Sequence, residues 1–259
     1  MQGNLLSQFD LSGKTALVTG ASSGFGWHFS QVLAAAGARV VAGARRIERL
    51  EALCREIGAD DGKAHPVQLD VTDAKSIGNA FDVAEATFGT VDILVNNAGI
   101  SRSALLLDLQ EEDWDAVLNT NLKAVWRVGS EAASRMRSAS RGGSIINVAS
   151  VLAFGTGKGL GSYMAAKAGV VQLTRAMALE WASADIRVNA LAPGYFPTEI
   201  SGDFFSTARG QEMIGRIPRR RVGEVNELAG PLLLLASGAS SYMTGSVVTV
   251  DGGHLCRTL

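Results

Sequence analysis

Short runs of β-branched and aliphatic residues alternate with longer segments of helical hydrophobic spacing from residue 14 to about residue 251. Strands are predicted at Thr15–Thr19, Arg39–Ala44, Ala64–Leu69, Val91–Asn96, Gly143–Val148, Ile186–Ala192 and Ser246–Val250. Helices are predicted at Gly24–Ala36, Arg46–Ile57, Asp73–Phe88, Glu111–Arg137, Tyr163–Ala182 and Glu224–Ser237. This order predicts an α/β fold in which helices cover both faces of a doubly wound, seven-stranded parallel sheet.

The alternation pauses over residues 194–222, which carry Pro197 and Pro218 and have no regular period. Long irregular segments in compact domains commonly cover an active site. We therefore expect a substrate lid at about 194–222, within a single dinucleotide-binding and catalytic domain that spans residues 1–259.

Composition narrows the class of protein. The chain has 24 Lys and Arg and 25 Asp and Glu, so its formal net charge is -1. It therefore lacks the positive charge that would favour binding to nucleic acid or to an anionic membrane, and a small-molecule partner is expected. The apolar block Leu232–Ala236 is too short to span a bilayer, and residues 1–14 lack the pattern of a secretion signal, so we expect a cytoplasmic protein. The cysteines, Cys54 and Cys256, form no metal-type cluster with the histidines, so no metal site is predicted.

The first predicted strand runs into Gly20-Ala-Ser-Ser-Gly24-Phe-Gly26 and then into a helix. Glycines let a dinucleotide pyrophosphate approach the backbone, and the helix N-terminus supplies N–H groups and the positive end of a dipole. The spacing differs from G-x-G-x-x-G, and glycines also mark ordinary turns, so the motif indicates a function only in combination with motifs later in the chain. The contacts expected from this turn are Gly20, Ser22, Ser23, Gly24, Phe25 and Gly26.

The end of the second predicted strand, Ala44-Arg45-Arg46, carries no carboxylate. An acidic residue there would bind the ribose 2′-hydroxyl of NAD, whereas a guanidinium pairs with the 2′-phosphate of NADP. The sequence therefore predicts NADP(H), with Arg45 as first contact and Arg46 as support. The alternative is that both arginines are solvated at a helix start.

The motifs together resemble the short-chain dehydrogenase/reductase family, in its single-domain branch, and the resemblance extends from Gly13 to Gly253. Its marks are Thr19-Gly20-x-x-x-Gly24-x-Gly26, Asp70-Val71, Asn96-Asn97-Ala98-Gly99, Asn121-Leu122, Ser150, Tyr163-x-x-x-Lys167, Pro193-Gly194 and Asp251-Gly252-Gly253. The chain is similar overall to the 3-oxoacyl reductases. The resemblance implies a Rossmann-like fold, a nicotinamide coenzyme and a homotetramer.

Tyr163 and Lys167 lie four residues apart, so on a helix their side chains share one face. A nearby ammonium lowers the pKa of a phenol, which suits a proton carrier. The resemblance implies that Lys167 also binds the nicotinamide ribose, that Ser150 holds the substrate oxygen, and that Asn121 supports a water and Lys167 in a proton relay. Taken singly, Ser150 is better explained as a turn cap and Asn121 as a solvated amide, and the Tyr163–Lys167 pair could be surface packing. Taken together with the glycine turn, the four residues favour the catalytic interpretation.

Further coenzyme contacts are implied by the resemblance alone. They are Asp70 and Val71 beside the adenine, Asn97, Ala98 and Gly99 along the ribose, and Pro193, Gly194, Phe196 and Thr198 toward the carboxamide. Asp70 could instead cap the next segment, and Asn96-Asn97 could tie neighbouring strands.

The expected substrate is a small alcohol or carbonyl compound. Candidate pocket residues are Ser101, Ser150, Val151, Leu152, Phe154, Tyr195, Phe204 and Phe205, whose mainly apolar character favours a hydrophobic or mid-sized ketone over a sugar, unless the aromatic rings pack only on each other. The run Arg219–Arg221 could meet the phosphate of CoA or acyl carrier protein, or could be a solvated charge run.

The function predicted is an NADP(H)-dependent oxidoreductase that interconverts a secondary alcohol and a ketone, with a 3-oxoacyl thioester as one candidate substrate. The alternatives are a sugar or polyol dehydrogenase on the same scaffold and a non-catalytic NADP-binding sensor. The helices predicted at Glu111–Arg137 and Tyr163–Ala182 are apolar around much of their circumference, which favours pairing between subunits in a homo-oligomer.

Overall fold

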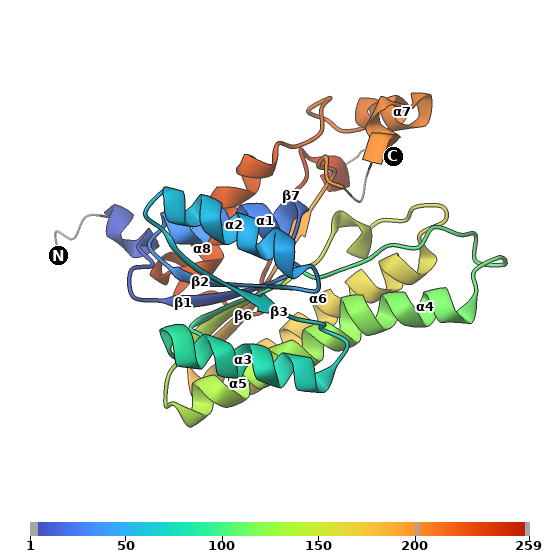
Figure 1. Cartoon of the computed structure of the whole chain (residues 1–259). Helices are drawn as coiled ribbons and strands as arrows, with labels where there is room; N and C mark the ends of the chain where they lie inside the picture. The colour runs from blue at the N-terminus through green and yellow to red at the C-terminus, as the bar shows by residue number, and fades with distance from the viewer. Residues whose placement is uncertain (1–4, 200–201, 257–259) are drawn as a thin grey trace.

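The computed structural model describes residues 5–199 and 202–256. Its centre is a sheet of seven strands in the order β3-β2-β1-β4-β5-β6-β7, with every neighbouring pair parallel (Figure 1). The strands are β1 Thr15–Thr19, β2 Arg39–Ala44, β3 Lys63–Gln68, β4 Ile93–Asn96, β5 Gly143–Val148, β6 Ile186–Pro193 and β7 Val247–Val250. The predicted doubly wound parallel sheet is confirmed.

Helices cover both faces of the sheet (Figure 1). One face carries α1 Gly24–Ala35, α2 Ile47–Ala59 and α8 Ala229–Ala236, and the other carries α3 Ala74–Phe88, α4 Glu111–Leu118, α5 Ala124–Ser138 and α6 Gly161–Trp181. Successive strand residues point to opposite faces, so Ala16 and Val18 of β1 join the first core while Leu17 joins the second. This burial on both sides explains why the inner strands β1 and β4 are mainly apolar, whereas the edge strand β3 has a single buried residue, Val67.

The structure departs from the predicted elements at three places. The helix predicted at Glu111–Arg137 is α4, a π-helical segment at Asn119–Lys123, and α5. The helix predicted at Glu224–Ser237 starts as a 3-10 turn, Val225–Leu228, before α8. The irregular stretch contains a short helix, α7 Ala208–Gly215, whose first turn is capped by the Thr207 hydroxyl. Short elements and one-residue insertions change the hydrophobic period too little to be predicted from it.

The strand order reverses between β1 and β4, which opens a crevice at the carboxyl ends of these strands. Asn97 ties the two strand ends together: its side-chain amide donates to the Thr19 carbonyl at 2.9 Å, and its backbone N–H donates to the Thr19 hydroxyl at 3.0 Å. Asn97 therefore ties neighbouring strands, which was one of the two roles open to it. Within the described ranges, none of the helices has the length and apolar character to cross a membrane.

Candidate functional site

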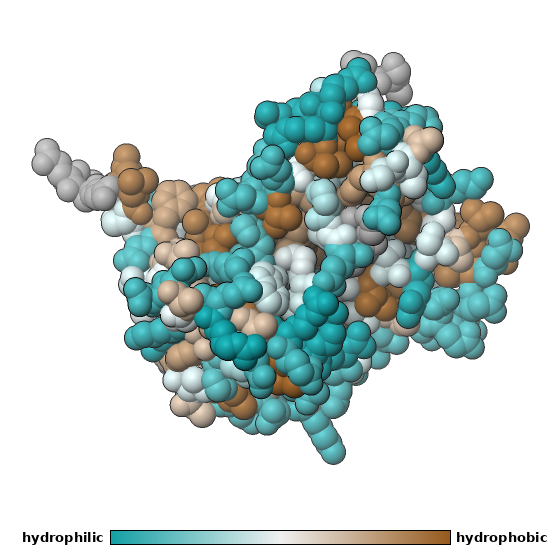
Figure 2. All heavy atoms as spheres, turned by 45° about the horizontal axis from the view of Figure 1, so that its top comes forward, coloured by the Kyte–Doolittle hydropathy of each residue, from teal (hydrophilic) through white to brown (hydrophobic). Residues whose placement is uncertain are grey.

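A cleft of about 2060 Å³ lies at the carboxyl edge of the sheet. The face turned forward in Figure 2 is hollowed between the α7 segment and the body of the molecule. Small-molecule pockets commonly measure about 300–1,000 Å³, so the cleft has room for a coenzyme and a substrate together. All the predicted coenzyme, catalytic and substrate contacts line it except Gly26 and Asn121.

The glycine turn forms one end of the cleft. Gly20 and Gly24 have positive φ angles of 67° and 56°, and a Cβ on Gly20 would lie 2.8 Å from the Ala98 Cα. A Cβ on Gly26 would collide with the Gly20 carbonyl oxygen, so a glycine at this position allows the close packing of the turn. The N-cap residue of α1, Ser23, makes no side-chain capping hydrogen bond. First-turn N–H groups that no side chain caps are suited to binding a phosphate.

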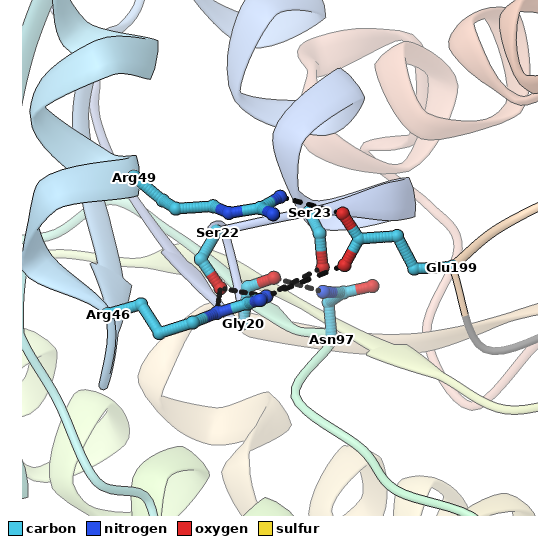
Figure 3. A network of polar contacts seen from close by, with 7 residues as sticks. All are labelled: Gly20, Ser22, Ser23, Arg46, Arg49, Asn97 and Glu199. Atoms are coloured by element: carbon cyan, nitrogen blue, oxygen red, sulfur yellow. Dashed lines mark hydrogen bonds and ion pairs between the residues drawn. The ribbon is translucent and has the colours of Figure 1, made fainter.

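Two arginines from α2 and its N-cap reach across this turn (Figure 3). Arg46 donates to the Ser22 hydroxyl at 3.0 Å and to the Ser23 hydroxyl at 3.1 Å. Arg49 donates to the Glu199 carboxylate at 2.7 Å, and the same carboxylate lies 3.7 Å from Arg46. Arg46 is therefore hydrogen-bonded to the glycine turn although its side chain is 49% exposed at the start of α2. No signal in the sequence indicated that Glu199 or Arg49 belongs to the site.

Arg45 also lines the cleft, on the side of Asp70. Asp70 accepts hydrogen bonds from the Thr72 hydroxyl at 2.7 Å and from the Thr72 backbone N–H at 2.9 Å. These two bonds, with a smaller contribution from the Arg45 charge, lower the pKa of the Asp70 carboxyl. Asp70 thus caps its own turn and also lines the cleft, while Asp73 caps α3.

Tyr163, Lys167 and Ser150 meet at the middle of the cleft. A hydrogen bond joins the hydroxyls of Ser150 and Tyr163. The Lys167 Nζ lies 5.7 Å from the centre of the Tyr163 ring and donates to the Val148 carbonyl at 2.7 Å. Ser150 is held in place as the N-cap of a 3-10 turn, where its Oγ accepts from the Leu152 N–H at 3.1 Å.

The protonation of this group differs from the expectation for a phenol beside an ammonium. Burial raises the pKa of Tyr163, although the hydrogen bond from Ser150 acts to lower it. Burial also lowers the pKa of Lys167 from 10.5 to about 8. The low polarity of the site disfavours the charged form of each group. The free protein therefore carries Tyr163 as a neutral phenol at neutral pH.

Asn121 is fully buried in the π-helical segment and does not line the cleft. Its side-chain carbonyl accepts from the Ile100 N–H and its amide donates to the Ile100 carbonyl, each at 2.8 Å. The carbonyl and the amide group of the Asn121 side chain are thus both hydrogen-bonded to the backbone that follows β4, instead of being solvated. These hydrogen bonds link Asn121 to the cleft wall rather than to Lys167.

The far end of the cleft mixes aromatic and charged groups. The Tyr195 ring meets Phe205 edge-on at 6.4 Å and His254 at 5.1 Å, while Phe204 and Phe205 lie 5.6 Å apart. The predicted aromatic residues therefore pack on each other and also line the cleft. Lys158, Arg209, Arg216 and His254 also line the cleft. Sequence reasoning missed these four, because only the folded path of the chain brings α7, the segment before α6 and the segment after β7 to one cleft.

The part of the chain that the structure describes holds no group of three or more His, Cys, Asp or Glu side chains suited to a metal ion. The site therefore consists of a phosphate-type cradle with arginines, a buried lysine, and a tyrosine and serine that share a hydrogen bond. Such an arrangement can hold an anionic dinucleotide at one end and exchange a proton with a substrate oxygen at its centre.

Known proteins have the same organisation along their whole length. A profile of the family described as Enoyl-(Acyl carrier protein) reductase matches residues 20–254. The 3-oxoacyl-(acyl-carrier-protein) reductase FabG of Thermotoga maritima is 43% identical over 243 residues, which cover 94% of this chain and 98% of that protein. The 2-dehydro-3-deoxy-D-gluconate 5-dehydrogenase of Escherichia coli is 41% identical over 254 residues, which cover 98% of this chain and 100% of that protein.

A crystal structure of gluconate 5-dehydrogenase from Burkholderia cenocepacia J2315, in complex with NADP and tartrate, matches the fold with a TM-score of 0.94. Its sequence is 36% identical, and the match covers 98% of this chain and 100% of that one. With the parallel sheet, the glycine turn and the Ser150, Tyr163 and Lys167 group already in place, these similarities establish that the chain belongs to the short-chain dehydrogenase/reductase family.

Proposed function

We propose that the protein interconverts a secondary alcohol and a ketone with NADP(H), using Tyr163 as the proton carrier. One observation carries the proposal: the hydrogen-bonded hydroxyls of Ser150 and Tyr163 stand beside the buried Lys167 in a cleft whose other end is the glycine turn. A non-catalytic coenzyme sensor would have no use for a buried lysine beside this pair, since burying an ammonium costs stability.

Hydride exchange at the carbon is the chemistry that the nicotinamide supplies when it is bound. The protein residues act on the substrate oxygen. Ser150 and Tyr163 bind this oxygen by hydrogen bonds, and Tyr163 donates a proton to it during reduction or accepts one from it during oxidation. Because burial raises the pKa of Tyr163, the phenol keeps its proton at neutral pH, which is the form that ketone reduction needs. Alcohol oxidation should accordingly become faster as the pH rises.

The Lys167 ammonium is positioned by its hydrogen bond to the Val148 carbonyl and would also hydrogen-bond the coenzyme ribose.

The coenzyme cradle fits a phosphorylated dinucleotide. The uncapped N-terminus of α1 suits the pyrophosphate, and Arg45 and Arg46, which line the same end of the cleft, suit a 2′-phosphate. The relative from Burkholderia cenocepacia binds NADP. We propose NADP(H) as the preferred coenzyme, with Asn97, Ala98, Gly99, Phe196 and Thr198 along its path.

Two substrate classes are supported, and both are represented among the similar proteins. A 3-oxoacyl thioester suits the apolar residues Leu152, Phe154 and Phe205. A sugar acid suits the cationic side chains of Lys158 and Arg209, which also line the cleft, because they can pair with its carboxylate. The second class gains its support from the tertiary structure, since no local pattern in the sequence places these cations at the site.

A panel of substrates tests the proposal. The change in NADPH absorbance would be followed with 3-oxoacyl thioesters, keto sugar acids and neutral sugars, and with gluconate and NADP⁺ for the reverse direction. Wild-type protein should turn over at least one class, and Tyr163→Phe should lose most of that rate, about 100-fold or more, with NADPH binding nearly unchanged. A Tyr163→Phe protein with wild-type rate would remove Tyr163 from the mechanism.

We also propose that the chain acts as a single domain in a homotetramer. Trp114, Trp126 and Leu179 of α4, α5 and α6 are 38%, 51% and 83% exposed. Large apolar side chains gathered on one helical layer are typical of a surface covered by another subunit. Light scattering at micromolar concentration should give a mass near four chains, and a monomer would contradict the proposal.

A further inference from the structure

The most unusual feature of the coenzyme end is a carboxylate among the groups suited to phosphate. Glu199 belongs to the segment after β6, yet its side chain reaches Arg49, Arg46 and the hydroxyl of Ser23, the N-cap residue of α1 (Figure 3). All three partners come from the first two βα units, and Arg49 lies 150 residues earlier in the chain. The negative charge of Glu199 therefore lies where the phosphates of a dinucleotide would be bound.

We propose that Glu199 is a specificity-determining residue that competes with the 2′-phosphate of NADP(H) for Arg46. The inference rests on the proposed coenzyme. Arg46 contacts three groups at once, namely the hydroxyls of Ser22 and Ser23 and the more distant Glu199. A guanidinium has a limited set of N–H donors, so a phosphate that binds Arg46 displaces the weaker of its existing contacts.

The distances indicate which contact gives way. Arg46 lies 3.7 Å from the nearer Glu199 oxygen, beyond ordinary hydrogen-bond length, whereas Arg49 is at 2.7 Å. Glu199 thus keeps its hydrogen-bonded ion pair with Arg49, whereas its interaction with Arg46 is electrostatic without a hydrogen bond. The Arg49 hydrogen bond is the largest of the contributions that lower the pKa of the Glu199 carboxyl, so the carboxylate remains charged at neutral pH.

The charge of Glu199 then acts differently on the two coenzymes. NADP(H) brings a dianionic phosphate toward a guanidinium that Glu199 partly neutralises, and the two anions repel each other. NAD(H) has a hydroxyl at this position and does not need Arg46. Any repulsion between Glu199 and the pyrophosphate near Ser23 is common to both coenzymes, so only the 2′-phosphate makes the effect of Glu199 specific to NADP(H). Because the Glu199 side chain is 53% exposed, solvent screens both effects, and the penalty is that of a surface ion pair.

Glu199→Gln removes the charge and keeps the shape of the side chain. Its Kd for NADPH, measured by fluorescence titration at low ionic strength, should be about threefold to fivefold lower than that of wild type, as expected for a surface ion pair worth up to about 1 kcal/mol. The Kd for NADH should change by less than about twofold, and the difference for NADPH should shrink as salt is added. Glu56→Gln, which makes the same change in net charge on α2 at a side chain bonded to Gln31, is the matched control and should leave both Kd values unchanged.

Tighter binding of NADPH alone would support the inference. Weaker binding of both coenzymes would make Glu199 a scaffold of the site and overturn it, as would an unchanged Kd or an equal gain in the Glu56→Gln control. In each of these outcomes wild-type protein still binds NADPH, so the proposed function stands. Wild-type protein that binds NADH but not NADPH would instead overturn the coenzyme assignment, and the inference with it.

Discussion

Replacement of Lys167 by Met tests the energetic consequence of burying an ammonium beside Tyr163. The Lys167 side chain is 4% exposed, and burial lowers its pKa from 10.5 to about 8. At about 1.4 kcal/mol for each tenfold change in an equilibrium constant, the charged form costs about 3 kcal/mol more in the folded than in the unfolded chain. Lys167→Met removes this cost but leaves the Val148 carbonyl without its donor, a loss of about 1–2 kcal/mol. The net change at pH 7 is a gain in stability of about 1–2 kcal/mol.

The pH dependence separates this reasoning from a simple packing effect. Below pH 8 the lysine is protonated in both states, so the full cost is present in wild type. Between pH 8 and 10 the folded chain releases its proton while the unfolded chain keeps most of it, so the unfolded state binds more protons and wild-type stability rises with pH. The advantage of Lys167→Met should therefore shrink by about 2–3 kcal/mol between pH 7 and pH 10 and reverse its sign.

Urea unfolding at one fixed protein concentration, followed by tryptophan fluorescence without coenzyme, measures both quantities. Lys75→Met is the control, because it removes an exposed lysine and should change stability by less than about 0.5 kcal/mol at each pH. A difference between Lys167→Met and wild type that stays constant from pH 7 to pH 10 would refute the reasoning, since a packing effect does not titrate.

Asp92→Ala, with Asp82→Ala as its control, probes the fold, and Arg46→Met probes the coenzyme end. Asp92 is 5% exposed and accepts from the Thr15 N–H at 2.9 Å and from Arg141 at 2.6 Å, so Asp92→Ala should lower the free energy of unfolding by about 3 kcal/mol. Asp82→Ala, which removes an exposed partner of Arg135, should cost less than about 1 kcal/mol, and equal losses in the two variants would contradict the role of burial. Arg46→Met should raise the Kd for NADPH about tenfold or more by removing a charge-assisted contact, and should leave the Kd for NADH within about twofold. Equal losses for the two coenzymes, measured by the same fluorescence titration, would show that Arg46 only supports the glycine turn through Ser22.

The strands and the long helices could be predicted because their signals are local. Uninterrupted apolar runs mark strands buried on both faces, and the glycine turn between β1 and α1 needs positive φ angles that favour glycine. The pairing of Tyr163 with Lys167 could be predicted in the same way, since a spacing of four on a helix fixes a shared face. Elements without such a signal were missed: α7 is only two turns long, and the π-helical segment around Asn121 leaves the hydrophobic period almost unchanged.

The sequence by itself thus determined the fold class, the glycine turn and the shared helix face of Tyr163 and Lys167, because each follows from neighbours in the chain, while the role expected for Ser150 came from the family resemblance. Only the tertiary structure decided that the pKa of Tyr163 is raised and that of Lys167 lowered, since burial by distant segments causes both shifts. It alone brought Glu199 to Arg46 and Arg49, and His254 to Tyr195. Contacts between segments far apart in the chain depend on the path of the whole backbone, which no local pattern records.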